Sequence, residues 1–177
     1  MGQNQTKSDR PEFVILDGSV VPFADAKISI MAPGFTFAAA VFEGLRAYWN
    51  EDEEQLYVFH LREHLDRLQF SMRVIEMDEP PSTGELADQV IAGLRANDFR
   101  EDTYIRVQTY IDDWGDMTAT GPVGSSVICR RRARLPAFET GKHFAVISWR
   151  RNADDASPPR IKATANYLNS RLVGLEA

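Results

Sequence analysis

The segment TYIRVQTYI (Thr103–Ile111) decides the predicted fold, because its apolar and polar side chains alternate strictly. Successive side chains of a β-strand point to opposite faces of a sheet, so each set belongs to one face. The set suited to a core comprises Ile105, Val107, Thr109 and Ile111. The other set, which suits a cleft, comprises Tyr104, Arg106, Gln108 and Tyr110. This strand predicts a sheet with one covered face and one face available to a ligand.

Further strands are expected along the chain. Residues 13–16 and 19–23 flank an Asp17-Gly18 turn and read as a short hairpin. The stretch 42–49 alternates like a strand. The acidic turn 50–54 joins it to residues 55–59, so the two segments predict a second hairpin. Residues 123–130 read as another strand. Together these segments predict a small antiparallel sheet.

Two helices are expected to cover that sheet. Apolar residues recur at steps of four and three in the first, at Leu61, Leu65, Leu68, Met72 and Ile75. Pro80 and Pro81 end that segment. Ser82 and Glu85 then form a capping box for a second helix, whose apolar residues are Leu86, Val90, Ile91 and Leu94. The predicted fold class is therefore α+β.

The pattern divides the chain into four parts. We expect a flexible N-terminus over residues 1–11, a small α+β domain over 12–133, an interdomain linker over 134–142 and the incomplete beginning of a larger domain over 143–177. Within the last part the sequence predicts a strand at 143–149, a polar loop at 151–160 and a helix from Ala165 onward, with Leu168, Leu172 and Leu175 in register. One strand and one helix cannot form a separate core.

Composition narrows the class of protein. The 177 residues are 44% hydrophobic and 26% charged, with a net charge of -6, as expected of a folded and water-soluble body. The one dense basic run, Arg130, Arg131, Arg132 and Arg134, is too short to make nucleic acid the expected partner. The single cysteine fits a reducing compartment, so the cytoplasm is predicted, and no segment is apolar and long enough to span a membrane.

The segment KATANYLNS (162–170) places one lysine between a loop and a helix start. By position alone Lys162 is typical of a solvated surface residue, and Tyr167 of a core aromatic. However, Lys-x-x-x-Asn-Tyr-Leu resembles the class IV (fold type IV) aminotransferases, and most of all the branched-chain aminotransferases. The resemblance implies that Lys162 binds pyridoxal 5'-phosphate covalently and moves the substrate proton, and that Tyr167 hydrogen-bonds the phenolate oxygen of the cofactor.

Residues 59–68 resemble the first-helix segment of the same family, which implies that Arg67 binds the phosphate group of the cofactor. Taken alone, Arg67 is typical of a solvated helix residue. The same stretch contains His60-x-x-Glu63-His64, which also fits an inverted zinc-protease motif. A catalytic zinc needs a third protein ligand, and the family explains all ten positions, so the sequence predicts no metal site.

Two strand segments complete the resemblance. Val-Phe-Glu-Gly-Leu-Arg at residues 41–46 is close to the family's Val-Phe-Glu-Gly-hydrophobic-Arg run, which implies a substrate pocket lined by Phe42, Gly44 and Arg46. The alternative is a half-buried strand with a bulge at Gly44. Tyr104-Ile105-Arg106 resembles the strand whose arginine recognises the distal carboxylate of glutamate or 2-oxoglutarate.

Phe37 departs from the family, because it stands where a tyrosine commonly helps to arrange the substrate carboxylate. It is expected in the substrate pocket without that hydroxyl, which weakens the branched-chain assignment and leaves the aminotransferase assignment intact.

The resemblance implies amino transfer between a branched-chain or related amino acid and 2-oxoglutarate by a homodimer or larger homo-oligomer. A D-amino acid aminotransferase, an aminodeoxychorismate lyase and an amine transaminase share this fold and remain alternatives, as does a non-catalytic remnant of it. The family continues well beyond the matched residues, including the carboxylate that pairs with the pyridine nitrogen. We therefore expect the 177 residues alone to be inactive.

Overall fold

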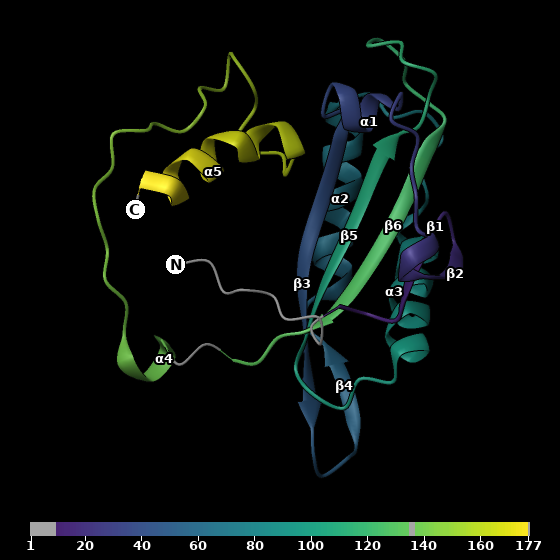
Figure 1. The fold of residues 1–177 in the computed structure, drawn as a ribbon, viewed down its shortest axis with the longest axis vertical. Helices are drawn as coiled ribbons and strands as arrows, with labels where there is room; N and C mark the ends of the chain where they lie inside the picture. Colours follow the sequence, from purple (N-terminus) through teal and green to yellow (C-terminus); the bar gives the residue numbers. More distant parts are fainter. Residues whose placement is uncertain (1–9, 135–136, 177) are drawn as a thin grey trace.

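The computed structural model describes residues 10–134 and 137–176, with the side chains of residues 137 and 138 excepted. One six-stranded antiparallel sheet dominates it, in the order β2-β1-β6-β5-β3-β4 (Figure 1). The strands are β1 (Phe13–Leu16), β2 (Ser19–Pro22), β3 (Ala40–Asn50), β4 (Gln55–Val58), β5 (Thr103–Ile111) and β6 (Val123–Arg131). Both predicted hairpins are present. At the first, Asp17 and Gly18 have φ of 47° and 79°, as a two-residue turn between twisted strands requires.

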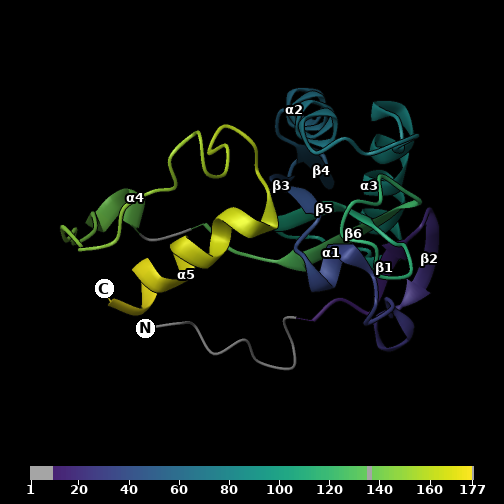
Figure 2. The same ribbon diagram turned by 90° about the horizontal axis from the view of Figure 1, so that it is seen from above.

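The helices are α1 (Pro33–Thr36), α2 (Leu61–Val74), α3 (Thr83–Asn97), α4 (Ala137–Thr140) and α5 (Tyr167–Glu176), with short 3-10 turns η2 (Phe23–Asp25) and η3 (Thr164–Asn166). α2 packs on β3, and α3 packs on β1 and β6, so both cover the same face of the sheet (Figures 1 and 2). The predicted capping box at Ser82 and Glu85 is formed. No described helix has the length and apolar character needed to cross a membrane.

The core lies between that face and the two helices. Leu65, Leu68 and Met72 of α2 and Leu86 and Val90 of α3 are completely buried. They meet the face of β5 that the alternation assigned to the core, where Ile105, Val107, Thr109 and Ile111 are buried. This arrangement of α and β elements is the predicted α+β fold.

The opposite face of β5 is half-buried at Tyr104, Arg106 and Gln108, as a cleft-facing set should be. Tyr110 differs from the prediction, because it is only 3% exposed. Its side chain fills space left by two glycines: a Cβ on Gly124 would lie 2.5 Å from the Tyr110 ring, and one on Gly34 would lie 2.6 Å from its Cβ. The available part of this face is therefore confined to the other end of the strand.

The strand expected at residues 143–149 is absent, and that prediction is wrong. The segment lies apart from the sheet (Figure 1), with Phe144 93% and Val146 104% exposed. A strand needs a neighbour for its backbone N–H and C=O groups, and within the described residues none lies beside it. Part of the expected linker 134–142 is also helical, as α4. Of the expected flexible N-terminus, residues 1–9 lie outside the described residues, as do residues 135 and 136 of the linker.

Candidate active site

The backbone of β3 fixes the position of Lys162. The backbone N–H of Phe42 donates to the carbonyl oxygen of Lys162 at 3.0 Å, and Ala163 forms a β-bridge with Val41. The hydroxyl of Thr164 donates to the carbonyl oxygens of Ala38 and Ala40 at 3.0 and 3.2 Å. A lysine far downstream in the sequence is thus held at the edge of β3, beyond the reach of β4, by bonds to the main chain.

Asn166 holds the loop that leads to the lysine. Its side chain is only 1% exposed. The Oδ1 atom accepts from Asn152 Nδ2 at 2.9 Å and from Ser157 Oγ at 2.6 Å, while Nδ2 donates to the carbonyl oxygen of Pro158 at 3.0 Å. This buried amide satisfies three polar groups of the loop, which an apolar side chain could not do. Asn166 therefore fixes the position of η3 and of the start of α5 relative to this loop.

The Lys162 side chain lies against two aromatic rings. Nζ donates to the hydroxyl of Tyr167 at 2.6 Å. Phe42 packs on Tyr167 with 4.8 Å between ring centroids, and Nζ lies 5.0 Å from the centre of the Phe42 ring. The three residues, predicted from two separate motifs, are therefore brought together from β3, the loop and the start of α5.

Arg67 reaches this site from α2. Its Nε and Nη2 atoms donate to Oε1 and Oε2 of Glu43 at 2.6 and 2.7 Å, and His64 Nδ1 lies 2.9 Å from Oε2 of the same carboxylate. This hydrogen bonding to Glu43 raises the pKa of Arg67 above its ordinary value. A guanidinium has five N–H groups, so three remain for an anion after the pair with Glu43 is made.

These side chains line a small cavity of about 210 Å³, bounded by Arg67, Arg151, Pro159, Arg160, Ile161, Lys162 and Tyr167. The lining fits pyridoxal phosphate in kind, because it offers an amine for covalent attachment, a phenol beside that amine and guanidinium groups for a phosphate.

Gly44, Arg46 and Tyr104 line a different cavity of about 800 Å³ on the same face of the sheet. The alternative of a bulge at Gly44 is excluded, because β3 pairs with β5 without interruption from Ala40 to Ala47. Gly44 is needed for a close approach instead: a Cβ there would lie 2.7 Å from the Tyr104 hydroxyl.

Three predicted substrate residues, Phe42, Arg106 and Phe37, line neither cavity. Arg106 stacks on Phe42, with 4.1 Å from its guanidinium carbon to the ring centre, and burial lowers its pKa from the ordinary value. Its Nε is buried and has no hydrogen-bond partner among the described residues. Phe37 is 48% exposed at the end of α1 and lines neither cavity.

Glu43 and Asn166 are the residues that the sequence analysis missed. Glu43 occupies a core-facing position of β3 between the buried Val41 and Leu45, and it is 0% exposed. A carboxylate at an apolar position of a strand alternation was the available signal, because a buried charge requires a partner. Asn166 stood within the quoted lysine motif but was given no role.

The histidines of the zinc-protease alternative are not gathered around a common point. His60 Nδ1 contacts Glu63 at 3.2 Å, whereas His64 Nδ1 faces Glu43. No three potential metal ligands come together in the part of the chain that the structure describes.

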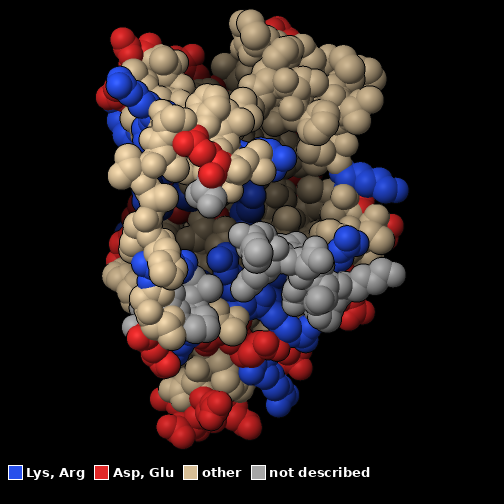
Figure 3. Space-filling model, turned by 60° about the vertical axis from the view of Figure 1, so that its left-hand side comes forward, with Lys and Arg blue, Asp and Glu red and all other residues tan. Residues whose placement is uncertain are grey.

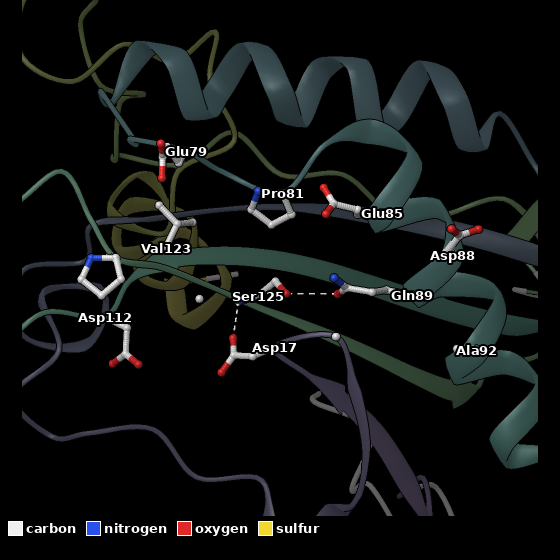
Figure 4. A pocket seen from close by; sticks show the side chains of 13 residues that line it. Asp17, Glu79, Pro81, Glu85, Asp88, Gln89, Ala92, Asp112, Val123 and Ser125 are labelled. Atoms are coloured by element: carbon white, nitrogen blue, oxygen red, sulfur yellow. Dashed lines mark hydrogen bonds between the residues drawn. The ribbon is translucent and has the colours of Figure 1, made fainter.

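A further cavity of about 690 Å³ lies between α3, the start of β6 and the β1–β2 turn (Figure 4). Its charged lining is acidic: Asp17, Glu79, Glu85, Asp88 and Asp112. Ser125 is held there by Asp17 and Gln89, through its backbone N–H and its hydroxyl. None of the predicted site residues lines it, so we assign it no part in the candidate site.

The chain belongs to the class IV aminotransferases, because the sequence profile of the family described as Amino-transferase class IV matches residues 40–177. This confirms the resemblance found in the four motifs, and with it fold type IV. Among curated proteins, it is 38% identical to a probable branched-chain-amino-acid aminotransferase of Aquifex aeolicus, with 97% of this chain and 56% of the relative covered. It is 33% identical to the branched-chain-amino-acid aminotransferase of Escherichia coli K12, with 95% of this chain and 55% of the relative covered.

Solved structures give the same result. The branched-chain aminotransferase of Thermoproteus uzoniensis with norvaline matches at a TM-score of 0.81 and 36% identity, covering 94% of this chain and 56% of that one. The branched-chain amino acid aminotransferase of Thermobaculum terrenum in its PLP form matches at a TM-score of 0.76 and 31% identity, over 93% and 54%. The chain thus spans about half the length of the relatives it matches.

Proposed function

We propose that this chain carries the lysine-bearing half of an enzyme that uses pyridoxal 5'-phosphate to transfer an amino group from a branched-chain or related amino acid to 2-oxoglutarate. The observation that carries the proposal is the 2.6 Å hydrogen bond between Lys162 and Tyr167 beside a cavity that Arg67 also lines. The names of the relatives support the substrate class, and nothing in them favours the D-amino acid, lyase or amine-transaminase alternatives.

Each residue has a role that its surroundings support. When bound, the cofactor supplies an electron sink that lets the substrate Cα–H bond break. Lys162 Nζ accepts that proton and returns it as the general base and acid. The loop that carries Lys162 is fixed by β3 and Asn166, so Nζ is held in place for this transfer. The Tyr167 hydroxyl orients Nζ, and Phe42 excludes water from one side of both groups. Arg67 binds the phosphate with the donors that Glu43 leaves free.

The substrate-binding roles of Gly44, Arg46, Tyr104, Arg106 and Phe37 belong to the same proposal. Arg106 is the group for a distal carboxylate, supported by its unpartnered Nε behind Phe42. Phe37 is the weakest member, since it is half exposed and lines neither cavity.

The domain division also belongs to the proposal. Residues 12–133 form the small domain and residues 143–177 begin the larger cofactor domain. The relatives carry nearly as much sequence again, and we propose that turnover needs that part. A homodimer or larger assembly is proposed from the family resemblance alone, and the cytoplasmic location stays a prediction.

The test is an absorption spectrum of the purified chain mixed with pyridoxal phosphate. A visible band that is lost in Lys162→Ala and kept in Lys142→Ala is the expected result, because Lys142 is an exposed lysine outside the site. A band that is equal in both variants, or no band in either, contradicts the assignment of Lys162. Leucine-dependent amino transfer by the protein extended to the length of its relatives then tests the reaction.

A further inference from the structure

The basic run at the end of β6 is divided between the two faces of the sheet. Arg131 continues the core-facing alternation of Val127 and Cys129, stacks 5.3 Å from the centre of the Phe99 ring and donates to Glu101 at 2.8 Å. Arg130 and Arg132 instead lie over the opposite side, with guanidinium carbons 5.0 and 5.4 Å from the centre of the Tyr104 ring. A run split in this way cannot follow a phosphate backbone along one surface.

Arg132 and Arg134 line the 800 Å³ cavity together with Arg46, Tyr48, Phe59 and Tyr104. Its size lies within the range of ligand pockets, about 300–1,000 Å³. Figure 3 shows Lys and Arg side chains gathered in the middle of the face that the view presents, above the acidic end of the molecule.

Positive charge predominates at this cavity. Asp102 is the carboxylate closest to the arginines, at 3.0 Å from Arg134 Nε and 3.8 Å from Arg46 Nη2, and Glu139 is the one acidic residue of the lining. Within the described residues, Arg130 and Arg132 have no carboxylate partner. Three guanidinium groups and one carboxylate therefore line the cavity, with Asp102 beside two of the arginines, and a bound anion would restore the balance.

Aromatic rings give the cavity a second preference. Arg134 stacks 5.2 Å from the centre of the Tyr48 ring, and Arg46 stacks 5.7 Å from it. Stacking uses the flat face of a guanidinium and leaves its N–H groups for hydrogen bonds. Arg46 donates from Nη2 to the carbonyl oxygen of Arg132 at 2.6 Å, and Arg134 donates from Nε to Asp102 at 3.0 Å, so their remaining N–H groups can meet an anion. The rings of Tyr48, Phe59 and Tyr104 line the same cavity and offer aromatic surface to a ligand ring. The lining thus suits a ring that bears an anionic group.

The cavity begins at Gly44, which pairs with Arg106, and extends along β3 away from Phe42, beyond the place where Arg106 would hold a short dicarboxylic acid. Phe42, beside Lys162, and Arg46 lie on the same face of β3 and four residues apart, or about 13 Å along a strand. We infer that this cavity is a second anionic subsite, which binds a carboxylate or phosphate on the ring-bearing side chain of an extended amino or 2-oxo acid. That this ligand is a substrate rests on the proposed function. That the cavity binds an anion does not.

Binding of small aromatic anions to the chain without cofactor tests the inference, followed by NMR titration. The probes are 4-methylbenzoate, its neutral match 4-methylbenzamide, and 4-methylphenyl phosphate, which separates a carboxylate from a phosphate preference. At least one anion should bind about tenfold or more tightly than the amide, as expected for charge-assisted hydrogen bonds. The double variant Arg132→Gln and Arg134→Gln should bind that anion more weakly by a similar factor.

Arg131→Gln is the matched control, because it removes one charge from the same run on the other face and should leave binding unchanged. The inference would be overturned if Arg131→Gln lost as much anion affinity as the double variant, if the amide bound as tightly as the anions, or if neither anion bound. Arg132 and Arg134 are exposed, so their substitution leaves the core intact. Lys162→Ala should abolish the cofactor band and leave anion binding unchanged, which separates a failure of this inference from a failure of the proposed function.

Discussion

Glu43 is fully buried on the core-facing side of β3, yet both of its carboxylate oxygens accept hydrogen bonds from Arg67, at 2.6 and 2.7 Å. The Arg67 side chain is 53% exposed, so the pair joins the core to the rim of the cavity that contains Lys162. Glu43 therefore acts as a positioning residue, which fixes the guanidinium that is proposed to bind phosphate. The same carboxylate also accounts for His64, whose motif resembled a metal site.

Glu43→Gln should lower the stability of the fold, because it removes the charge that a buried ion pair requires. Breaking a buried pair costs about 3–5 kcal/mol, and the exposed arginine places the loss here nearer to about 1–3 kcal/mol. Urea unfolding measures it. Pyridoxal phosphate should also bind more weakly even where the variant is folded, a result that a purely structural role would not produce. Glu63→Gln, an exposed change on α2, is the control and should alter neither quantity.

Tyr167→Phe should leave the fold intact and weaken cofactor binding. The phenyl ring keeps its contact with Phe42, whereas the hydrogen bond to Lys162 Nζ is lost. A hydrogen bond contributes about 0.5–1.5 kcal/mol, so affinity should fall about three- to tenfold. Titration of the Lys162-dependent absorption band gives the affinity. An unchanged affinity would mean that the Tyr167 hydroxyl does not act on the lysine when the cofactor is present.

Gly44→Ala should destabilise the protein and disturb the larger cavity. The new methyl group would lie 2.7 Å from the Tyr104 hydroxyl and 3.2 Å from its ring, so Tyr104 must move. Overpacking of this kind costs about 1–3 kcal/mol, measurable by urea unfolding. The matched control is Gly84→Ala in the first turn of α3, where the added Cβ meets only Ser82 Oγ at 3.9 Å. If both variants were equally stable, the close approach of Tyr104 to Gly44 would be disproved.

Asn166→Ala should loosen the lysine loop without unfolding the sheet. The change leaves Asn152, Ser157 and the Pro158 carbonyl without their buried partner, at a cost of about 1–3 kcal/mol. Hydrogen exchange should become faster over residues 152–167 and stay unchanged in β5. Asn169→Ala is the control, since its side chain makes one exposed hydrogen bond to the Arg150 carbonyl. Protection that is lost equally in β5 would show that the loop is not a separate unit.

The sequence alone determined most of the elements of this protein, because their patterns are local. The alternation in residues 103–111, the four-and-three spacing from Leu61 and the Ser82–Glu85 capping box each depend on neighbours within a few positions. The motif at residues 162–170 likewise placed Lys162 and Tyr167 together, since they are five residues apart at a helix start. The family also followed from motifs read along the chain.

Tertiary structure alone decided which distant groups meet. The pairing of Glu43 with Arg67 depends on the packing of α2 on β3, and the packing of Phe42 on Tyr167 depends on the bridge between Val41 and Ala163. The absence of a strand at residues 143–149 has the same cause. Alternation is a property of one segment. A strand forms only where a neighbouring strand pairs with its backbone N–H and C=O groups, and the sequence of the segment does not show whether that neighbour exists.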